Sequence, residues 1–194
     1  MVEFKYKFLR TLSNPNDVVS KVFSVLRIVP DILERNTVES LGYISATDIV
    51  APRDFPPYNR SAVDGFAVKA EDVSSASLMN PITLKVIGFM HTNDSPEKYR
   101  IDHGECVEVT TGAPLPLGAD AVVMVEHTRR ISEEEVEVVK PVAKWDNVSL
   151  KGEDIRKNQV IIRKGEIIRP WHIGALATLN ITKIKVYRKL KAAV

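Results

Sequence analysis

The sequence predicts a mainly β fold with some α+β elements, arranged in two units and with one helix near the N-terminus. Short stretches rich in β-branched residues lie close to Gly, Pro, Asn or Asp, as strands bounded by turns do. Only one segment has convincing helical spacing, and the composition changes twice along the chain. The clearest expected strands span residues 82–89, 106–110, 121–125, 136–139, 160–163 and 181–187.

The expected helix spans residues 14–29. Asn14 is suited to cap it, Pro15 fits its first turn, and Pro30 ends it because proline cannot donate the next helical hydrogen bond. Its apolar residues recur at helical spacing: Val18, Val19, Val22, Val25, Leu26 and Val29.

Two changes in composition predict the division into units. The proline-rich segment 52–57 precedes a run of different character, and an acidic middle region ends near residues 146–149. A unit inserted into another would produce this pattern. We therefore expect an inserted β-rich unit of residues 55–148, carried by a discontinuous unit made of residues 1–54 and 149–194.

Charge is distributed unevenly, although the net charge is only +2. Nine acidic and two basic residues lie between Asp102 and Glu137, whereas eleven basic and three acidic residues lie between Lys151 and Lys191. The basic stretch either attracts phosphate, oxyanions or nucleic acid, or forms solvated strand faces. Aromatic residues at the spacing that stacks bases are missing from it, so we expect no nucleic-acid partner. An RNA-binding β-domain, the alternative, would bind with steep salt dependence.

The composition excludes several classes of protein. The chain of 194 residues is 44% hydrophobic and 27% charged, which is typical of a globular protein and argues against disorder. No apolar run approaches the roughly 20 residues that span a bilayer, and no secretory signal is visible, so we expect a cytoplasmic protein without a membrane partner. Cys106 is the only cysteine, which excludes an intrachain disulfide and a multi-cysteine zinc site. The four histidines lack the i, i+4 spacing of a zincin site.

The end of the sequence has the pattern of an interrupted strand. Residues 183–187 alternate as a strand does, and residues 190–194 are small and apolar apart from Lys191. We expect Val194 to belong to a further buried strand and the sequence to be a fragment.

Residues 56–68 form the first of three segments with candidate functional groups. Two prolines stiffen the approach, and Asp64 and Gly65 form a tight turn that leads into an apolar strand. An aspartate held there can coordinate a metal or orient a ligand. Alternatively it hydrogen-bonds its own turn.

Residues 109–123 form the second segment. A strand ends in Thr110 and Thr111, and Gly112 then permits close approach of the backbone to a ligand. Such loops can hold an oxyanion with backbone N–H groups and hydroxyls, or serve as structural turns. The segment is not a P-loop, because the lysine is absent and the glycine spacing is wrong.

Residues 151–156 form the third segment. Two adjacent carboxylates, Glu153 and Asp154, follow a glycine and are flanked by cations. They either bind a hydrated magnesium ion or form ion pairs with their neighbours.

Taken in this order, the three segments resemble the molybdopterin molybdenumtransferase family, which includes the MoeA proteins and the E domain of gephyrin. Residues 57–68 match its pattern of proline, then Ser-Ala-hydrophobic-Asp-Gly-aromatic-Ala-Val. Residues 111–123 match Thr-Gly-Ala-Pro-x-Pro-x-Gly-x-x-Ala-Val-Val, and residues 152–155 match Gly-Glu-Asp-hydrophobic. The resemblance covers the N-terminal domains I and II of the family and runs from about Asn14 to the end.

The resemblance implies coiled and bifurcated β-sheets, an elongated first domain and a homodimer. It also implies the reaction: molybdate is inserted into adenylylated molybdopterin with Mg²⁺, and AMP is released. Motif matches assign catalytic roles to Asp64, Thr111 and Asp154, with Asp64 also organising the metal or molybdate. They assign ligand binding to Ser61, Gly65, Thr110, Gly112, Lys151 and Glu153.

The departures from the family pattern bear on activity. The family continues with a Ser/Asn-Thr-Gly-Asp-Glu stretch and a domain resembling an adenylyltransferase, so we expect this chain to be inactive without them. Val63 and Phe66 replace the usual methionine and tyrosine, and Lys151 lacks the bidentate geometry of arginine. A non-catalytic pterin-binding module, or a dimerisation or scaffold module, is the alternative function.

Overall fold

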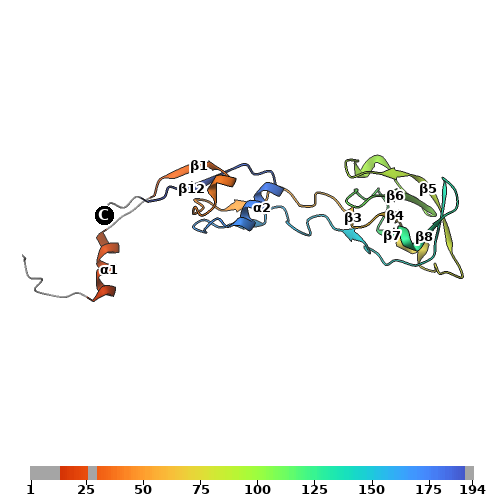
Figure 1. Ribbon diagram of the computed structural model, residues 1–194, viewed down its shortest axis with the longest axis horizontal. Helices are drawn as coiled ribbons and strands as arrows, with labels where there is room; N and C mark the ends of the chain where they lie inside the picture. Colours follow the sequence, from red (N-terminus) through yellow and green to blue (C-terminus); the bar gives the residue numbers. More distant parts are fainter. Residues whose placement is uncertain (1–13, 26–29, 191–194) are drawn as a thin grey trace, which may run out of the picture.

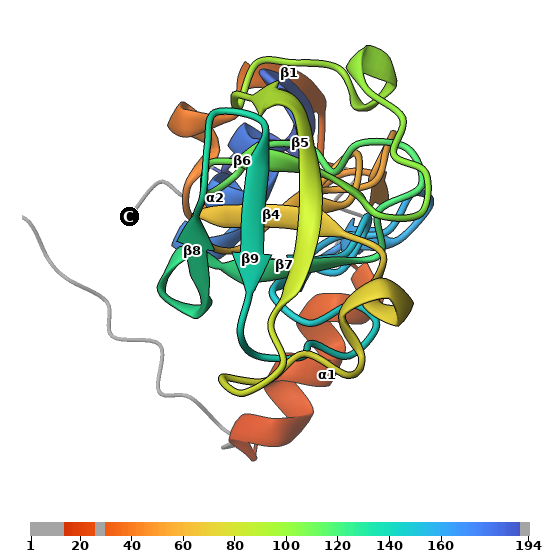
Figure 2. The ribbon, with the colours of Figure 1, turned by 90° about the vertical axis from the view of Figure 1, so that its right-hand side faces the viewer.

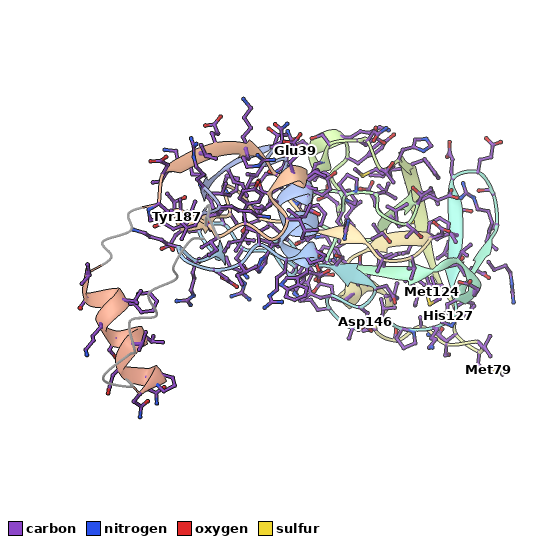
Figure 3. The ribbon with its side chains drawn as sticks, turned by 60° about the vertical axis from the view of Figure 1, so that its left-hand side comes forward. Glu39, Met79, Met124, His127, Asp146 and Tyr187 are labelled. Carbon is purple, nitrogen blue, oxygen red and sulfur yellow. The ribbon has the colours of Figure 1, made fainter. Side chains whose placement is uncertain are left out.

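The computed structural model describes residues 14–25 and 30–190. Along the long axis of the molecule, a six-stranded sheet lies apart from a second group of elements that contains β1, β12 and α2 (Figure 1). Figure 3 marks the two regions with Tyr187 on β12 and Met124 on β7. No helix in the described ranges is long and apolar enough to cross a bilayer.

Helix α1, Pro15–Val25, begins where the sequence predicts. The Asn14 carbonyl accepts hydrogen bonds from the N–H groups of Asp17 and Val18, and the Asn14 side chain accepts one from Asn16. None of the α1 residues is buried, and the Phe23 side chain is 74% exposed. The predicted end of the helix lies outside the described residues.

The six-stranded sheet has the order β7-β4-β6-β5-β9-β8 and is strongly curled (Figure 2). Its neighbouring strands are antiparallel except for β5 and β6, which are parallel. The strands are β4 Gly65–Val68, β5 Ile82–Met90, β6 Glu105–Val109, β7 Ala121–Met124, β8 Thr128–Arg130 and β9 Glu135–Val138.

Both faces of this sheet are packed around β4, which explains why this strand is apolar and buried throughout. In β4, Phe66 and Val68 belong to one core cluster and Ala67 to the other. Cys106 and Val107 divide between the same two clusters in β6. Successive residues of a strand point to opposite faces, so a strand covered on both sides needs apolar residues at every position.

The second group of elements is built from segments far apart in the sequence. Strand β1, Ile32–Asn36, pairs with β12, Lys183–Tyr187, and β2, Ile49–Val50, pairs with β11, Val160–Ile162. Their core cluster is completed by helix α2, Pro170–Thr178, through Leu176. Residues before and after the six-stranded sheet therefore share one core.

The two regions are joined by the short pair of β3, Arg60–Ser61, and β10, Val148–Ser149. The division into residues 55–148 and residues 1–54 with 149–194 stays a prediction, since β10 straddles its second boundary. The remaining regular elements are the 3-10 helices η1 Val38–Ser40, η2 Ala70–Val73, η3 Pro96–Lys98 and η4 Val125–His127.

The structure confirms the mainly β fold but contains a second helix that the sequence did not predict. Helix α2 has Pro170 in its first turn and buries His172 and Leu176. Its nine residues are fewer than the 11–18 over which helical periodicity is detected, and it is largely apolar. Leu190 lies in no strand and is 66% exposed, and the rest of the predicted terminal strand lies outside the described residues.

Gly65 is required by the packing of β4 against β7. A Cβ atom at this position would lie 1.9 Å from the carbonyl oxygen of Val123. We expect Gly65→Ala to lower the free energy of unfolding by about 1–3 kcal/mol, measured by urea denaturation. Gly174→Ala is the control, because its Cβ would meet nothing within 4 Å and helical alanine should add about 0.5–1 kcal/mol. Equal stabilities of the two variants would contradict the packing argument.

Candidate functional site

Asp64 and Thr111 form the centre of the candidate site. One carboxylate oxygen of Asp64, Oδ1, accepts a hydrogen bond from the Thr111 backbone N–H at 2.6 Å and another from the Thr111 hydroxyl at 3.0 Å. Both residues are exposed. The carboxylate therefore bonds to a residue 47 positions away and not to its own turn.

The sheet register brings these two residues together. Asp64 directly precedes β4, Thr111 follows β6 by two positions, and Gly65 pairs with Val109 between those strands. The two hydrogen bonds lower the pKa of the Asp64 carboxyl below its ordinary value, with the backbone N–H of Thr111 as the larger cause. The carboxylate is therefore ionised at neutral pH.

The turn after β6 is fixed by contacts with the first segment. Gly112 has a positive φ of 84° and donates its N–H to the Ser61 carbonyl at 2.8 Å. Ser61 is buried, and its own N–H donates to the carbonyl of Ala113. These hydrogen bonds of Ser61 and Gly112 hold the turn that carries Thr111 next to the segment that carries Asp64.

The predicted oxyanion cradle is not formed by the backbone of this loop. The N–H groups of residues 110–113 are all donated within the chain, to the Met90 carbonyl, the Asp64 carboxylate, the Ser61 carbonyl and the Thr110 carbonyl, respectively. Of the two alternatives that the sequence left open, the backbone of this loop has the geometry of the structural turn, because all four donors bond within the chain. The turn of residues 110–113 consequently has no free backbone donor, and Asp64 adds carboxylate oxygens to this surface.

The third segment contacts the first one at residues 56–59, several positions before Asp64. Gly152 donates its N–H to the Pro56 carbonyl at 3.0 Å, and Lys151 donates its N–H to the Asn59 side chain at 2.9 Å. All three predicted segments therefore meet along residues 55–64, the second at one end and the third at the other.

The Asp154 carboxylate is exposed, while its backbone N–H donates to the Phe55 carbonyl at 3.2 Å. Among the described residues, no contact joins Asp154 to Asp64 or Thr111. Glu153 accepts hydrogen bonds from the Ser149 hydroxyl and the Leu150 N–H, which lower its pKa, with Ser149 as the larger cause. Glu153 thus stabilises the turn of residues 149–153 through these two hydrogen bonds.

Lys151 lines a hollow of about 210 Å³ beside the third segment. Its ammonium lies 3.8 Å from the carboxylate of Asp54, which also accepts the N–H of Lys157 at 2.8 Å. The other residues lining the hollow are Pro52, Arg53 and Pro57. With three cations and one carboxylate, the hollow is positively charged.

A second cluster of polar groups was missed by the sequence analysis. Nδ1 of His103 lies 2.7 Å from Asp72, and its Nε2 lies 3.6 Å from Glu71. The three side chains have the chemistry of metal ligands and lie close enough to share an ion. Their spacing of about thirty positions has no local signature, and only the fold reveals the contact. His103 lies just before the start of β6, whereas Thr111 follows the other end of the same strand.

Residues 16–180 match the model of the MoeA N-terminal region, domains I and II. The chain belongs to the MoeA family. A Methanocaldococcus jannaschii protein named for molybdopterin biosynthesis is 47% identical over 79% of this chain and 36% of its own length. A molybdopterin molybdenumtransferase of Staphylococcus aureus is 41% identical over 80% of this chain and 37% of its own length.

The fold agrees with that of a solved MoeA structure. The molybdopterin biosynthesis MoeA protein of Pyrococcus horikoshii superimposes with a TM-score of 0.81 at 38% identity, over 91% of this chain and 44% of that one. The chain thus spans somewhat more than a third of the length of the curated MoeA relatives described above.

The hydroxyl of Thr111 is predicted to hold down the pKa of Asp64. Thr111→Val removes the hydroxyl donor but keeps the backbone N–H, so the Asp64 pKa should rise and still stay below its ordinary value of 3.8. The carboxyl ¹³C titration of Asp64 by NMR measures it, with Thr110→Val as the matched control.

The lowered pKa of Asp64 makes the stability of the fold depend on pH. The contacts of the Asp64 carboxylate stabilise the fold above the ordinary pKa, and this contribution is lost as pH falls through the lowered value. An Asp64 pKa that does not respond to Thr111→Val would refute the assigned cause.

Proposed function

We propose that this chain forms one wall of the site at which molybdate is inserted into adenylylated molybdopterin, with release of AMP. The observation that carries the proposal is the pair of hydrogen bonds from Thr111 to Asp64, which links the first and second family segments at an exposed position. The names of the relatives support the substrate class.

The oxygen atoms of this pair suit a hard cation. Asp64 is ionised, and its Oδ2 atom has no hydrogen-bond partner among the described residues. The Thr111 hydroxyl donates its hydrogen bond to Asp64, so its oxygen lone pairs remain available as acceptors. Carboxylate and hydroxyl oxygens are ligands that Mg²⁺ accepts. When bound, Mg²⁺ would neutralise charge on the adenylate phosphate.

We assign each residue a role on these grounds. Asp64 holds the metal and orients the oxygen atoms around it, and Thr111 holds Asp64 and accepts a hydrogen bond from substrate or bound water. Asp154 and the basic hollow around Lys151 contact another part of the substrate, with Ser61, Gly65 and Gly112 fixing the backbone beneath. Thr110 and Glu153 remain proposed binding residues.

We further propose that the site is completed by the remainder of the family's length and by a homodimer. The exposure of Asp64, Thr111 and Asp154 supports an opposite wall supplied by other polypeptide. The exposed apolar face of α1, with Val22 and Phe23, supports a partner surface. The same face favours the second candidate function, a dimerisation or scaffold module without turnover.

Release of AMP separates the two functions. The chain is mixed with adenylylated molybdopterin, molybdate and Mg²⁺, alone and together with polypeptide corresponding to the C-terminal remainder of the family. We expect AMP only from the complete mixture. Release of AMP by this chain alone would show that the site does not need the additional polypeptide. A complete mixture that releases no AMP would favour the scaffold function.

Asp64→Asn tests the central carboxylate in the same mixture. The amide keeps the size of the side chain but loses its negative charge, so we expect AMP release to fall by about 10- to 100-fold. Asp31→Asn is the control, because Asp31 is exposed and pairs only with Arg188 among the described residues. Both variants should stay folded, with Asp64→Asn somewhat less stable because its amide oxygen accepts the Thr111 hydrogen bonds without the charge. Unaltered turnover in Asp64→Asn would remove Asp64 from the site.

A further inference from the structure

Strand β5 carries an irregularity that changes which face its last residues occupy. In the parallel pair with β6, Val86 lies opposite Cys106, but Phe89 lies opposite Glu108. Strand β5 thus contains one extra residue over this stretch. A bulge of this kind turns the following side chains to the other face of the sheet, and bulges are common next to active sites.

The bulge buries Met90 and exposes His91. Met90 lies opposite Val109 and is fully buried in the same core cluster. Phe89 and His91 fall on the other side, where their rings meet edge to face with centroids 4.4 Å apart. At the bulge, Gly88 leaves room for Tyr99, whose ring would lie 2.3 Å from a Cβ atom there.

This change of face places His91 beside the Asp64–Thr111 pair. Val109 lies opposite both Gly65 of β4 and Met90 of β5. The next residues outward on the three neighbouring strands are Asp64, Thr110 and His91. Since adjacent strands lie about 4.8 Å apart, the backbones of Asp64 and His91 are roughly 10 Å apart.

Direct contacts confirm that the two loops touch. The N–H of Thr110 donates to the Met90 carbonyl at 3.4 Å. A Cβ atom on Gly112 would lie 3.4 Å from the methyl carbon of Thr92. The loop that carries His91 therefore borders the turn that carries Thr111.

The backbone of His91 is anchored by a hydrogen bond, whereas its ring packs on Phe89 and leaves both nitrogens unbonded within the described part of the chain. The His91 N–H donates to Asp94 at 2.7 Å, and Lys98 donates to the same carboxylate oxygen at 2.8 Å. Across the described ranges, neither ring nitrogen of His91 has a hydrogen-bond partner. The ring of His103, in contrast, is engaged by Asp72.

We propose that His91 is a further ligand-binding residue of this site, donating a ring N–H to an oxygen of a tetrahedral oxyanion held beside Asp64 and Thr111. The inference rests on the proposed function. The backbone donors of residues 110–113 are already used, so an oxyanion at this end of the sheet would take its hydrogen bonds from side chains. An imidazole N–H one strand beyond Thr110 supplies it. The oxyanion is either the phosphate of the adenylate or molybdate.

The test compares His91→Ala, His91→Gln and His103→Ala in the complete mixture that releases AMP. The KM for adenylylated molybdopterin is measured at saturating molybdate, and the KM for molybdate at saturating adenylate. Loss of a hydrogen bond to a charged group weakens binding by about tenfold or more. We therefore expect His91→Ala to raise one of the two KM values about tenfold, with a smaller effect on kcat.

The two arms identify which oxyanion His91 contacts, since only the KM of that substrate should rise. His91→Gln retains an N–H donor and should recover part of the affinity, and His103→Ala should match the unaltered chain. The thermal unfolding temperature of His91→Ala should stay close to that of the unaltered chain, because the His91 side chain is exposed.

Unchanged KM values for both substrates in His91→Ala, while Asp64→Asn impairs turnover, would overturn the assignment of His91 and leave the proposed function standing. Absence of AMP release from the unaltered mixture would instead overturn the proposed function, and with it the role of His91.

Discussion

One carboxylate oxygen holds the candidate site together. Oδ1 of Asp64 accepts both donors of Thr111, and because the residues are 47 positions apart, the contact fixes the start of β4 against the end of β6. Hydrogen bonds to an ionised acceptor are stronger than those between neutral groups. The same two bonds lower the pKa of Asp64, so the geometry of the site and its negative charge have one cause.

This contact also determines what kind of ligand the site suits. Phosphate-binding loops direct free backbone N–H groups at the anion. Here residues 110–113 donate all four of their N–H groups within the chain, and what faces outward is carboxylate and hydroxyl oxygen. A cation fits such a surface directly. An anion fits it only together with a cation or with a side-chain donor from a neighbouring strand, which is the position that His91 occupies.

The six strands named from the sequence are found within two residues of their predicted ends because each is a local pattern, such as the apolar run in β7, Ala121–Met124. The sequence did not predict short strands such as β2 and β3. It also joined three segments through their family resemblance. It could not predict that β5 and β6 are parallel, or that Gly112 donates to Ser61, because these depend on contacts between distant segments. The bulge in β5 was equally inaccessible, since nothing local shows that Met90, rather than Phe89, is the buried residue.

The segment of residues 55–64 contacts both of the other family segments. Phe55 accepts the N–H of Asp154 at one end, and Asp64 accepts the donors of Thr111 at the other. These two acceptors lie nine positions apart in the sequence, and a chain of this length extends to at most roughly 30 Å. Under the proposed function, a single ligand that contacts the carboxylates of both Asp64 and Asp154 would have to span the distance between the two ends of this segment. A rotation of the backbone near Phe55 would change the distance between the carboxylates of Asp64 and Asp154 while leaving each local turn intact.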